Sequence, residues 1–321
     1  MKTNLPDRPR PPWRDYLDAA LSPNTRRAYA HAWREFAAFC AAASCQPLPA
    51  DEAALLSYIS WLDRARRNRP STVRIKLAAL RYVHARAHPS APNPVDAPAV
   101  RDALVGLARL RRAARLRKGA LLTPDLARAL ALLPDTPAGR RDRALLLLGF
   151  AGAFRRSELV SLDVADLTLR KRLAVLRLRG SKGDPTAQGE SKVIHAEADP
   201  ALCPVRALQD WLATLRAHRL ADGPLFTRMD ATGKPTDRRL SAQSVALIVK
   251  RIVAAAGLDP RQFSGHSLRA GFITAAALAG AQEHDIQRVS GHKSADVLRQ
   301  YIRDSGVGQQ RAQHAAFSLR E

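Results

Sequence analysis

The sequence has 321 residues, of which 52 are Lys or Arg and 29 are Asp or Glu, so the formal net charge at pH 7 is +23. At roughly 150 residues per domain, this length predicts two domains. The longest uncharged apolar run, residues 144–154, is too short to span a bilayer. Residues 1–7 lack the apolar stretch of a signal peptide. We therefore expect a cytoplasmic protein, and the membrane and secreted classes are disfavoured.

The three cysteines, Cys40, Cys45 and Cys203, form neither a CxxC pair nor an even disulfide set. A cysteine-ligated metal site is therefore disfavoured as well. A net charge this large opposes compaction unless a polyanion neutralises it. Codon bias toward Ala and Arg explains part of the basic excess, but it does not explain the shortage of acidic residues. The composition favours nucleic acid as the partner.

The first third of the chain has the pattern of a small helical bundle. Ser22-Pro23 is typical of a helix start, and apolar residues follow at helical spacing to about residue 43. Further helices are predicted over 52–66, from Pro70 to about residue 83, and over about 100–110. Residues 109–119 are dominated by Arg and Leu and end in Gly, which indicates an interdomain linker, with a solvated helix end as the alternative.

The rest of the chain is predicted to be mainly helical with one small antiparallel sheet. Thr123-Pro124-Asp125 is typical of a helix N-cap region. The predicted helices span about 124–133, 138–152, 156–161, 204–217, 241–256, 266–279, 283–290, 295–303 and 308–318. The predicted strands are 167–169, 173–176 and 193–195, with a Gly-rich loop at 180–189. We thus expect a helical domain over 1–108, a basic linker over 109–119, and an α-rich domain with a small sheet over 120–321.

Several residues of the second domain are suited to phosphate chemistry, although each has an ordinary explanation by itself. His266 and Arg269 share a helix face at i and i+3, which suits an anion. About one His-x-x-Arg is expected by chance here, and His31 with Arg34 forms another that we interpret as surface decoration. Arg155 follows a very apolar helix, and Glu158 lies one turn on to orient it. A surface salt bridge is the alternative for that pair.

Two further side chains carry chemistry that a guanidinium cannot supply. Lys182 lies in the Gly-rich loop, where an ammonium near a phosphate can donate a proton. Tyr301 is flanked by arginines, whose charge lowers the cost of a phenolate able to attack phosphorus. The ordinary explanations are a solvated loop lysine and a half-buried packing tyrosine.

The joint order of these residues resembles the tyrosine recombinase (phage integrase) family. Residues 153–159 are similar to its first box, where the Arg-x-x-Glu spacing selects Arg155, although Ala153-Phe154 replaces the more usual Gly-Leu or Gly-Met. Residues 264–271 are similar to the second box, and Gly291-His292 through Tyr301 to the third. The stretches around His266 and Tyr301 look closest to the Cre branch.

The resemblance implies a fold and a mechanism. It implies a helical, SAM-like core-binding domain followed by a catalytic domain that forms a 3′-phosphotyrosyl bond with duplex DNA. Arg155, His266, Arg269 and His292 would surround the phosphate, Tyr301 would attack, and Lys182 would protonate the leaving 5′-oxygen. Lys192, on the far strand of the same hairpin, competes with Lys182 for that assignment. No metal, ATP or other cofactor is implied.

The same resemblance implies how the protein assembles and which alternatives compete. A homo-tetramer on the nucleoid would exchange strands through a Holliday junction, with the 306–321 tail docking on a neighbour or closing its own core. The candidate DNA-contacting side chains are Arg26, Arg27, Arg74, Lys76, Arg81 and Gln243. Each of them either reads a base, touches only phosphate or makes no contact. The alternatives are a type IB-like topoisomerase and a catalytically inactive DNA-binding regulator. A metal-dependent nuclease is disfavoured because paired carboxylates and His clusters at ligand spacing are not found in the sequence.

Overall fold

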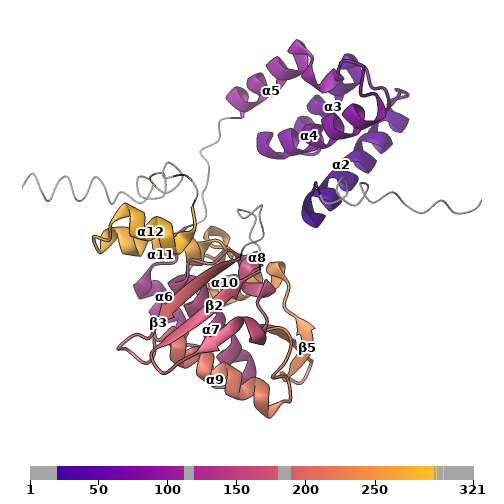
Figure 1. Cartoon of the computed structure of the whole chain (residues 1–321). Coiled ribbons are helices and arrows are strands. Elements are labelled where there is room, and N and C mark those ends of the chain that lie inside the picture. The colour runs from indigo at the N-terminus through magenta and orange to yellow at the C-terminus, as the bar shows by residue number, and fades with distance from the viewer. Residues whose placement is uncertain (1–19, 112–118, 180–188, 293, 295–298, 300–321) are drawn as a thin grey trace, which may run out of the picture. The chain divides into compact units, whose positions relative to one another are not determined.

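The computed structural model describes residues 20–111, 119–179 and 189–292, together with Ser294 and Arg299. The chain divides into two compact units, Met1–Arg115 and Leu116–Glu321 (Figure 1). Each unit has its own buried hydrophobic cluster. None of the helices in the described part of the chain combines the length and apolar character needed to cross a bilayer.

The first unit is a small helical bundle. Its elements are α2 (Pro23–Ala42), α3 (Glu52–Arg64), α4 (Pro70–Ala87), the 3₁₀ turn η1 (Pro94–Asp96) and α5 (Pro98–Leu110). Ser22 Oγ accepts from Thr25 N at 3.2 Å, so the helix start predicted at Ser22 is present, and Asp51 Oδ1 caps α3 by accepting from Ala54 N at 2.7 Å. Phe36, Tyr58 and Leu77 are among the fully buried side chains of the core.

The second unit combines short helices with two small sheets. Its helical elements are α6 (Thr123–Ala131), α7 (Pro137–Ala151), α8 (Arg156–Ser161), η2 (Val164–Asp166), α9 (Pro204–Ala217), α10 (Ala242–Ala255), η3 (Pro260–Gln262), α11 (Ser267–Leu278) and α12 (Glu283–Ser290). Its strands are β1 (Leu167–Leu169), β2 (Leu173–Leu178), β3 (Glu190–His195), β4 (Thr227–Met229) and β5 (Pro235–Arg239). The predicted helices over 295–303 and 308–318 lie outside the described residues.

The main sheet is antiparallel in the order β1-β2-β3, with Thr168 opposite Val175 and Val175 opposite Val193. The predicted hairpin and third strand are therefore confirmed, as is the mainly α fold with a small antiparallel sheet. The sequence analysis does not predict the β4–β5 hairpin, because these short strands carry polar and charged side chains. Thr123 is also not an N-cap residue: Leu122 occupies that position and Thr123 begins α6.

Close backbone contacts align the helices that carry the candidate site. Leu121 N donates to Ser267 O at 3.0 Å, which ties the chain before α6 to the start of α11. A Cβ atom on Gly271 would lie 2.0 Å from the Leu121 carbonyl oxygen, so only glycine permits this approach. A Cβ atom on Gly149 of α7 would lie 2.8 Å from Leu268 Cδ1 and 3.0 Å from Leu159 Cδ1. Helix α11 thus lies close to the chain before α6, and α8 and α11 both pack against α7.

Candidate active site

The turn between α7 and α8 presents Arg155. Helix α7 ends at Gly152, and Ala153 turns the chain with a positive φ of 47°, a conformation that L residues rarely adopt. Ala153 and Phe154 are buried, whereas Arg155 at the N-cap of α8 keeps a third of its side chain exposed. The apolar α7 and the buried turn therefore give this arginine a rigid base.

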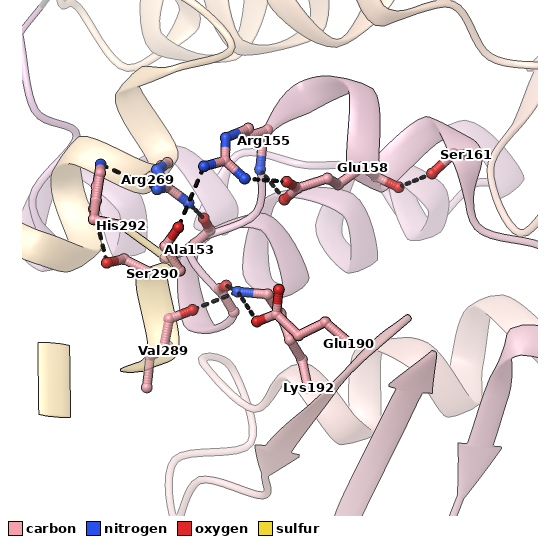
Figure 2. Close-up of polar contacts among 12 residues, drawn as sticks. Ala153, Arg155, Glu158, Ser161, Glu190, Lys192, Arg269, Val289, Ser290 and His292 are labelled. Carbon is pink, nitrogen blue, oxygen red and sulfur yellow. Dashed lines mark hydrogen bonds and ion pairs between the residues drawn. The ribbon is translucent and has the colours of Figure 1, made fainter. Parts of the chain in front are cut away.

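Glu158 clamps Arg155 by both its backbone and its side chain (Figure 2). Its Oε2 accepts from Arg155 N at 2.8 Å, and its Oε1 accepts from Arg155 Nη1 at 2.5 Å. Arg155 Nη2 donates to Gly291 O at 3.4 Å. The Glu158 carboxylate is 8% exposed, so the pair is only partly screened by water. The contact that we expect between Arg155 and Glu158 is therefore present.

Helix α11 contributes a second arginine and a histidine. Arg269 is 1% exposed and donates from Nη1 to Ala153 O at 2.8 Å, so the same turn that presents Arg155 also holds Arg269. His266 lies at the N-cap of α11, one turn before Arg269, and its side chain reaches the surface. Partial loss of hydration, with Arg269 and Arg155 nearby, lowers the pKa of His266.

The segment after α12 contributes His292. Helix α12 ends at Gly291, which adopts the left-handed conformation with φ of 63°. Arg269 Nη2 lies 3.0 Å from His292 Nε2, and Ser290 Oγ lies 2.8 Å from His292 Nδ1. Burial, together with the charges of Arg269 and Arg155, lowers the pKa of His292 to about 4. The imidazole is therefore neutral at pH 7.

These side chains converge from three segments that are far apart in the sequence (Figure 2). Arg155, Arg269 and His292 are linked through Ala153 O, Gly291 O and their own direct contact. The neighbouring Lys192 ammonium adds further positive charge. A preorganised group of donors of this kind is suited to the oxygens of a phosphate whose negative charge grows in a transition state.

The model of the phage integrase family matches residues 121–306, which is more than half of the chain and spans this whole cluster. The chain belongs to the phage integrase family. A xerD homologue from Selenomonas ruminantium, described as an integrase/recombinase, is 36% identical over 294 residues, which cover 91% of this chain and 84% of the relative. The tyrosine recombinase XerD of Xanthomonas axonopodis pv. citri is 33% identical over 253 residues, which cover 78% and 77% of the two chains.

Solved structures of phage integrase family members share the fold. XerH site-specific recombinase, in a post-cleavage complex with a palindromic difH substrate, matches with a TM-score of 0.61 at 18% identity over 84% of this chain and 73% of that one. A lambda integrase dimer bound to a COC′ core site matches with a TM-score of 0.57 at 16% identity over 90% and 94% of the two chains. The comparisons confirm the family predicted from the sequence, whereas the likeness to the Cre branch stays a prediction.

Lys182 and Tyr301, the predicted acid and nucleophile of a phage integrase family member, lie outside the described residues. The structure does place Lys192, the competing lysine on β3, beside the cluster. The sequence analysis missed Ser290 and the carbonyls of Ala153 and Gly291, which contact His292, Arg269 and Arg155. Ser290 lies two residues before His292, but a serine at that spacing has no signal of its own.

The residues predicted to contact DNA lie on three helices. Arg26 and Arg27 are exposed on α2, Arg74 and Arg81 are exposed on α4, and Gln243 is exposed at the start of α10. Arg81 also pairs with Asp96 at 3.1 Å. Lys76 differs from the others, because its side chain is 12% exposed and its Nζ lies 2.5 Å from Glu35 Oε2 on α2. Contact of these six side chains with DNA stays a prediction.

Proposed function

We propose that this protein is a DNA strand transferase that performs site-specific recombination through a 3′-phosphotyrosyl intermediate. The observation that carries the proposal is the convergence of Arg155, Arg269 and His292, each held by backbone or side-chain contacts, in one cluster of hydrogen-bonding groups. A duplex supplies the phosphodiester that this cluster is shaped to hold. Membership of the phage integrase family adds support.

In the proposed cleavage step, the Tyr301 oxygen attacks the scissile phosphorus and the bond from phosphorus to the 5′-oxygen breaks. Arg155 and Arg269 donate hydrogen bonds to the non-bridging oxygens, with His266 and His292 completing the set. His266 also helps to remove the Tyr301 proton, while Lys182 gives a proton to the departing 5′-oxygen. The proton that Tyr301 loses is thus taken up at His266, and the proton that the 5′-oxygen gains comes from Lys182.

The phosphotyrosyl bond retains the energy of the phosphodiester, so a second DNA end reverses the step without ATP. The arginines supply positive charge and the histidines supply hydrogen bonds at the phosphate, so the proposed mechanism needs no metal ion. Four identical chains exchange strands in pairs through a Holliday junction, with the 306–321 tail of each chain docking on a neighbour. The reaction takes place in the cytoplasm, on the nucleoid, where its substrate is found.

The two units have separate parts in this proposal. Residues 1–108 form the core-binding domain, residues 109–119 form the linker, and residues 120–321 form the catalytic domain, so that the protein clamps the duplex. The partner is DNA in the solved relatives XerH and lambda integrase, whose complexes contain a difH substrate and a core site. The net charge of +23 predicts that binding weakens strongly as salt is raised.

Covalent trapping tests the proposal. Nicked duplexes tiled across the DNA that flanks the gene are incubated with wild type and with Tyr301→Phe, in EDTA and without ATP. We expect a denaturation-resistant protein–DNA adduct with wild type alone, at a defined site. An adduct that requires a divalent metal, or one that persists in Tyr301→Phe, would overturn the mechanism.

Two related functions are distinguished by the same reaction. A type IB-like topoisomerase would also form the adduct, but it would reseal the original strand and would not join two different duplexes. A catalytically inactive regulator would bind DNA but form no adduct. This would hold both for the tiled duplexes and for duplexes that are selected because the protein binds them. Recombinant product from two labelled duplexes therefore identifies the recombinase.

A further inference from the structure

Lys192 is a buried lysine that the proposed chemistry does not use. It lies on β3 with its side chain 7% exposed, although a buried ammonium is costly unless hydrogen bonds and charges compensate it. Its Nζ donates to Gly152 O at 3.0 Å and to Val289 O, and Glu190 Oε1 lies 3.9 Å away (Figure 2). The ammonium also lies over the Phe154 ring, 5.2 Å from its centroid.

The two carbonyls that accept from Lys192 belong to the two segments that carry the cluster. Gly152 ends α7 and lies three residues before Arg155, and its neighbour Ala153 accepts from Arg269. Val289 lies in the last turn of α12, three residues before His292. A single ammonium thus joins the turn that carries Arg155 to the segment that carries His292. Its two partners, Gly152 and Val289, are 137 positions apart in the sequence.

The chemistry of the group suits this bridging role better than proton transfer. An ammonium has three N–H donors and no acceptor. Two of those donors are used by backbone carbonyls, and the Glu190 carboxylate lies toward the third. A general acid needs a proton directed at the leaving oxygen, so an ammonium occupied in this way is poorly placed to donate one.

We propose that Lys192 is a positioning residue that sets the separation between Arg155 and His292 by holding the Gly152 and Val289 carbonyls together. It acts on the reaction only through those two side chains. The leaving-group proton is left to a different residue, for which Lys182 is the candidate. This inference rests on the proposed function.

The test compares Lys192→Met with Lys192→Arg and with Lys171→Met, whose lysine is exposed in the turn between β1 and β2. Lys192→Met should slow single-turnover cleavage of the trapped site about 100-fold, a typical effect of displaced catalytic groups. Lys192→Arg should recover much of that rate, because a guanidinium also donates to carbonyls but does not act as a general acid. Lys171→Met should cleave like wild type.

A substrate with sulfur in place of the 5′-bridging oxygen separates positioning from acid catalysis. A thiolate leaves without a proton, since thiols have a pKa near 8.5. Lys192→Met should therefore be as impaired on this substrate as on the ordinary one, whereas Lys182→Met should be rescued. Rescue of Lys192→Met, or cleavage by it at the wild-type rate on both substrates, would overturn the inference.

Amide hydrogen exchange of the DNA-free protein provides a readout that does not depend on recombination. Lys192→Met should exchange faster in residues 150–157 and 286–292, while the helices of the first unit stay unchanged. Unchanged exchange in both segments would contradict the inference. If wild type itself forms no adduct with any duplex, the proposed function fails, whereas the exchange result still decides the role of Lys192. Should Lys192→Met fail to fold, Lys192→Arg still decides the inference, because a large loss of cleavage in Lys192→Arg that the sulfur substrate restores would overturn it.

Discussion

Arg269 Nη2 donates to His292 Nε2 over 3.0 Å, which joins α11 to the segment after α12. A guanidinium has only donors, so Nε2 must be the acceptor and the imidazole proton must reside on Nδ1, facing Ser290 Oγ at 2.8 Å. In this state Nε2 has no proton to offer a phosphate. If His292 donates to a phosphate from Nε2, as proposed, Arg269 has to release that atom and Nε2 has to carry a proton.

The first prediction is that His292 titrates at about pH 4 in the DNA-free protein and at a higher pH once DNA is bound. Burial and the charges of Arg269 and Arg155 lower its pKa, and a phosphate in the cluster offsets those charges. Proton NMR of the imidazole, assigned with His292→Gln, measures both values, using Tyr301→Phe to keep the DNA uncleaved. A pKa near 6.5 in the DNA-free protein would contradict the contact geometry.

The same shift makes stability depend on pH. The unfolded chain protonates this histidine near pH 6.5, whereas the folded chain resists protonation down to about pH 4. The unfolded state then binds more protons in that window, so stability falls as the pH falls through it. Urea unfolding at pH 7 and pH 5 should show a smaller loss for His292→Gln than for wild type. The pKa of His266 is lowered too and acts in the same direction.

The second prediction separates Lys76 from its neighbour Arg74. Lys76 pairs with Glu35 where both side chains are nearly buried, and its removal leaves Glu35 with Arg66 Nε at 3.6 Å. Lys76→Met should lower the free energy of unfolding by about 1–3 kcal/mol, the cost of a buried group that loses its partner. It should leave the salt dependence of DNA binding unchanged, since the ammonium is occupied within the fold.

Arg74→Met serves as the matched substitution, because Arg74 is exposed on the same helix. The substitution should change stability little. If the Arg74 guanidinium neutralises a phosphate, the substitution should also reduce the slope of log affinity against log salt concentration by about 1. Urea unfolding and fluorescence anisotropy at several salt concentrations measure both quantities. The opposite pattern, a stable Lys76→Met with a reduced slope, would make Lys76 a DNA contact.

The third prediction concerns the close approach of α11 to the chain before α6. A Cβ atom at Gly271 would lie 2.0 Å from Leu121 O, a backbone atom that cannot rotate away. Gly271→Ala should therefore destabilise the second unit by about 1–3 kcal/mol, as overpacking usually does. It should also slow cleavage, since α11 carries Arg269.

Gly106→Ala is the control for that change. Gly106 lies within α5, and nothing lies within 4 Å of its added Cβ. The substitution should stabilise the first unit by about 0.5–1 kcal/mol because alanine favours the helical backbone. Thermal or urea unfolding reports both variants, and equal stability of Gly271→Ala and wild type would refute the proposed close approach.

Local features of the chain are readable from the sequence because their partners lie within one turn. Ser22 and Asp51 cap the helices that follow them, and Glu158 meets Arg155 at the i+3 position. The strands β2 and β3 follow from short apolar runs at 173–176 and 193–195 on either side of a Gly-rich loop. The joint order of an Arg, a hairpin Lys, His-x-x-Arg, Gly-His and a late Tyr along the chain predicts the phage integrase family, which the family match confirms.

Contacts between distant segments depend on how the helices pack, and a single sequence carries no signal for them. Nothing local distinguishes Lys76 from Arg74. In the fold, however, Lys76 pairs with Glu35 on another helix, whereas Arg74 is exposed. The sequence indicates Lys192 only as a competitor of Lys182 in the same hairpin. Its two carbonyl partners come from helix ends that the fold brings together. The sequence by itself determined which residue types are present for the chemistry, whereas packing decided which of them meet and in what protonation state, because burial and neighbouring charge arise only in the folded chain.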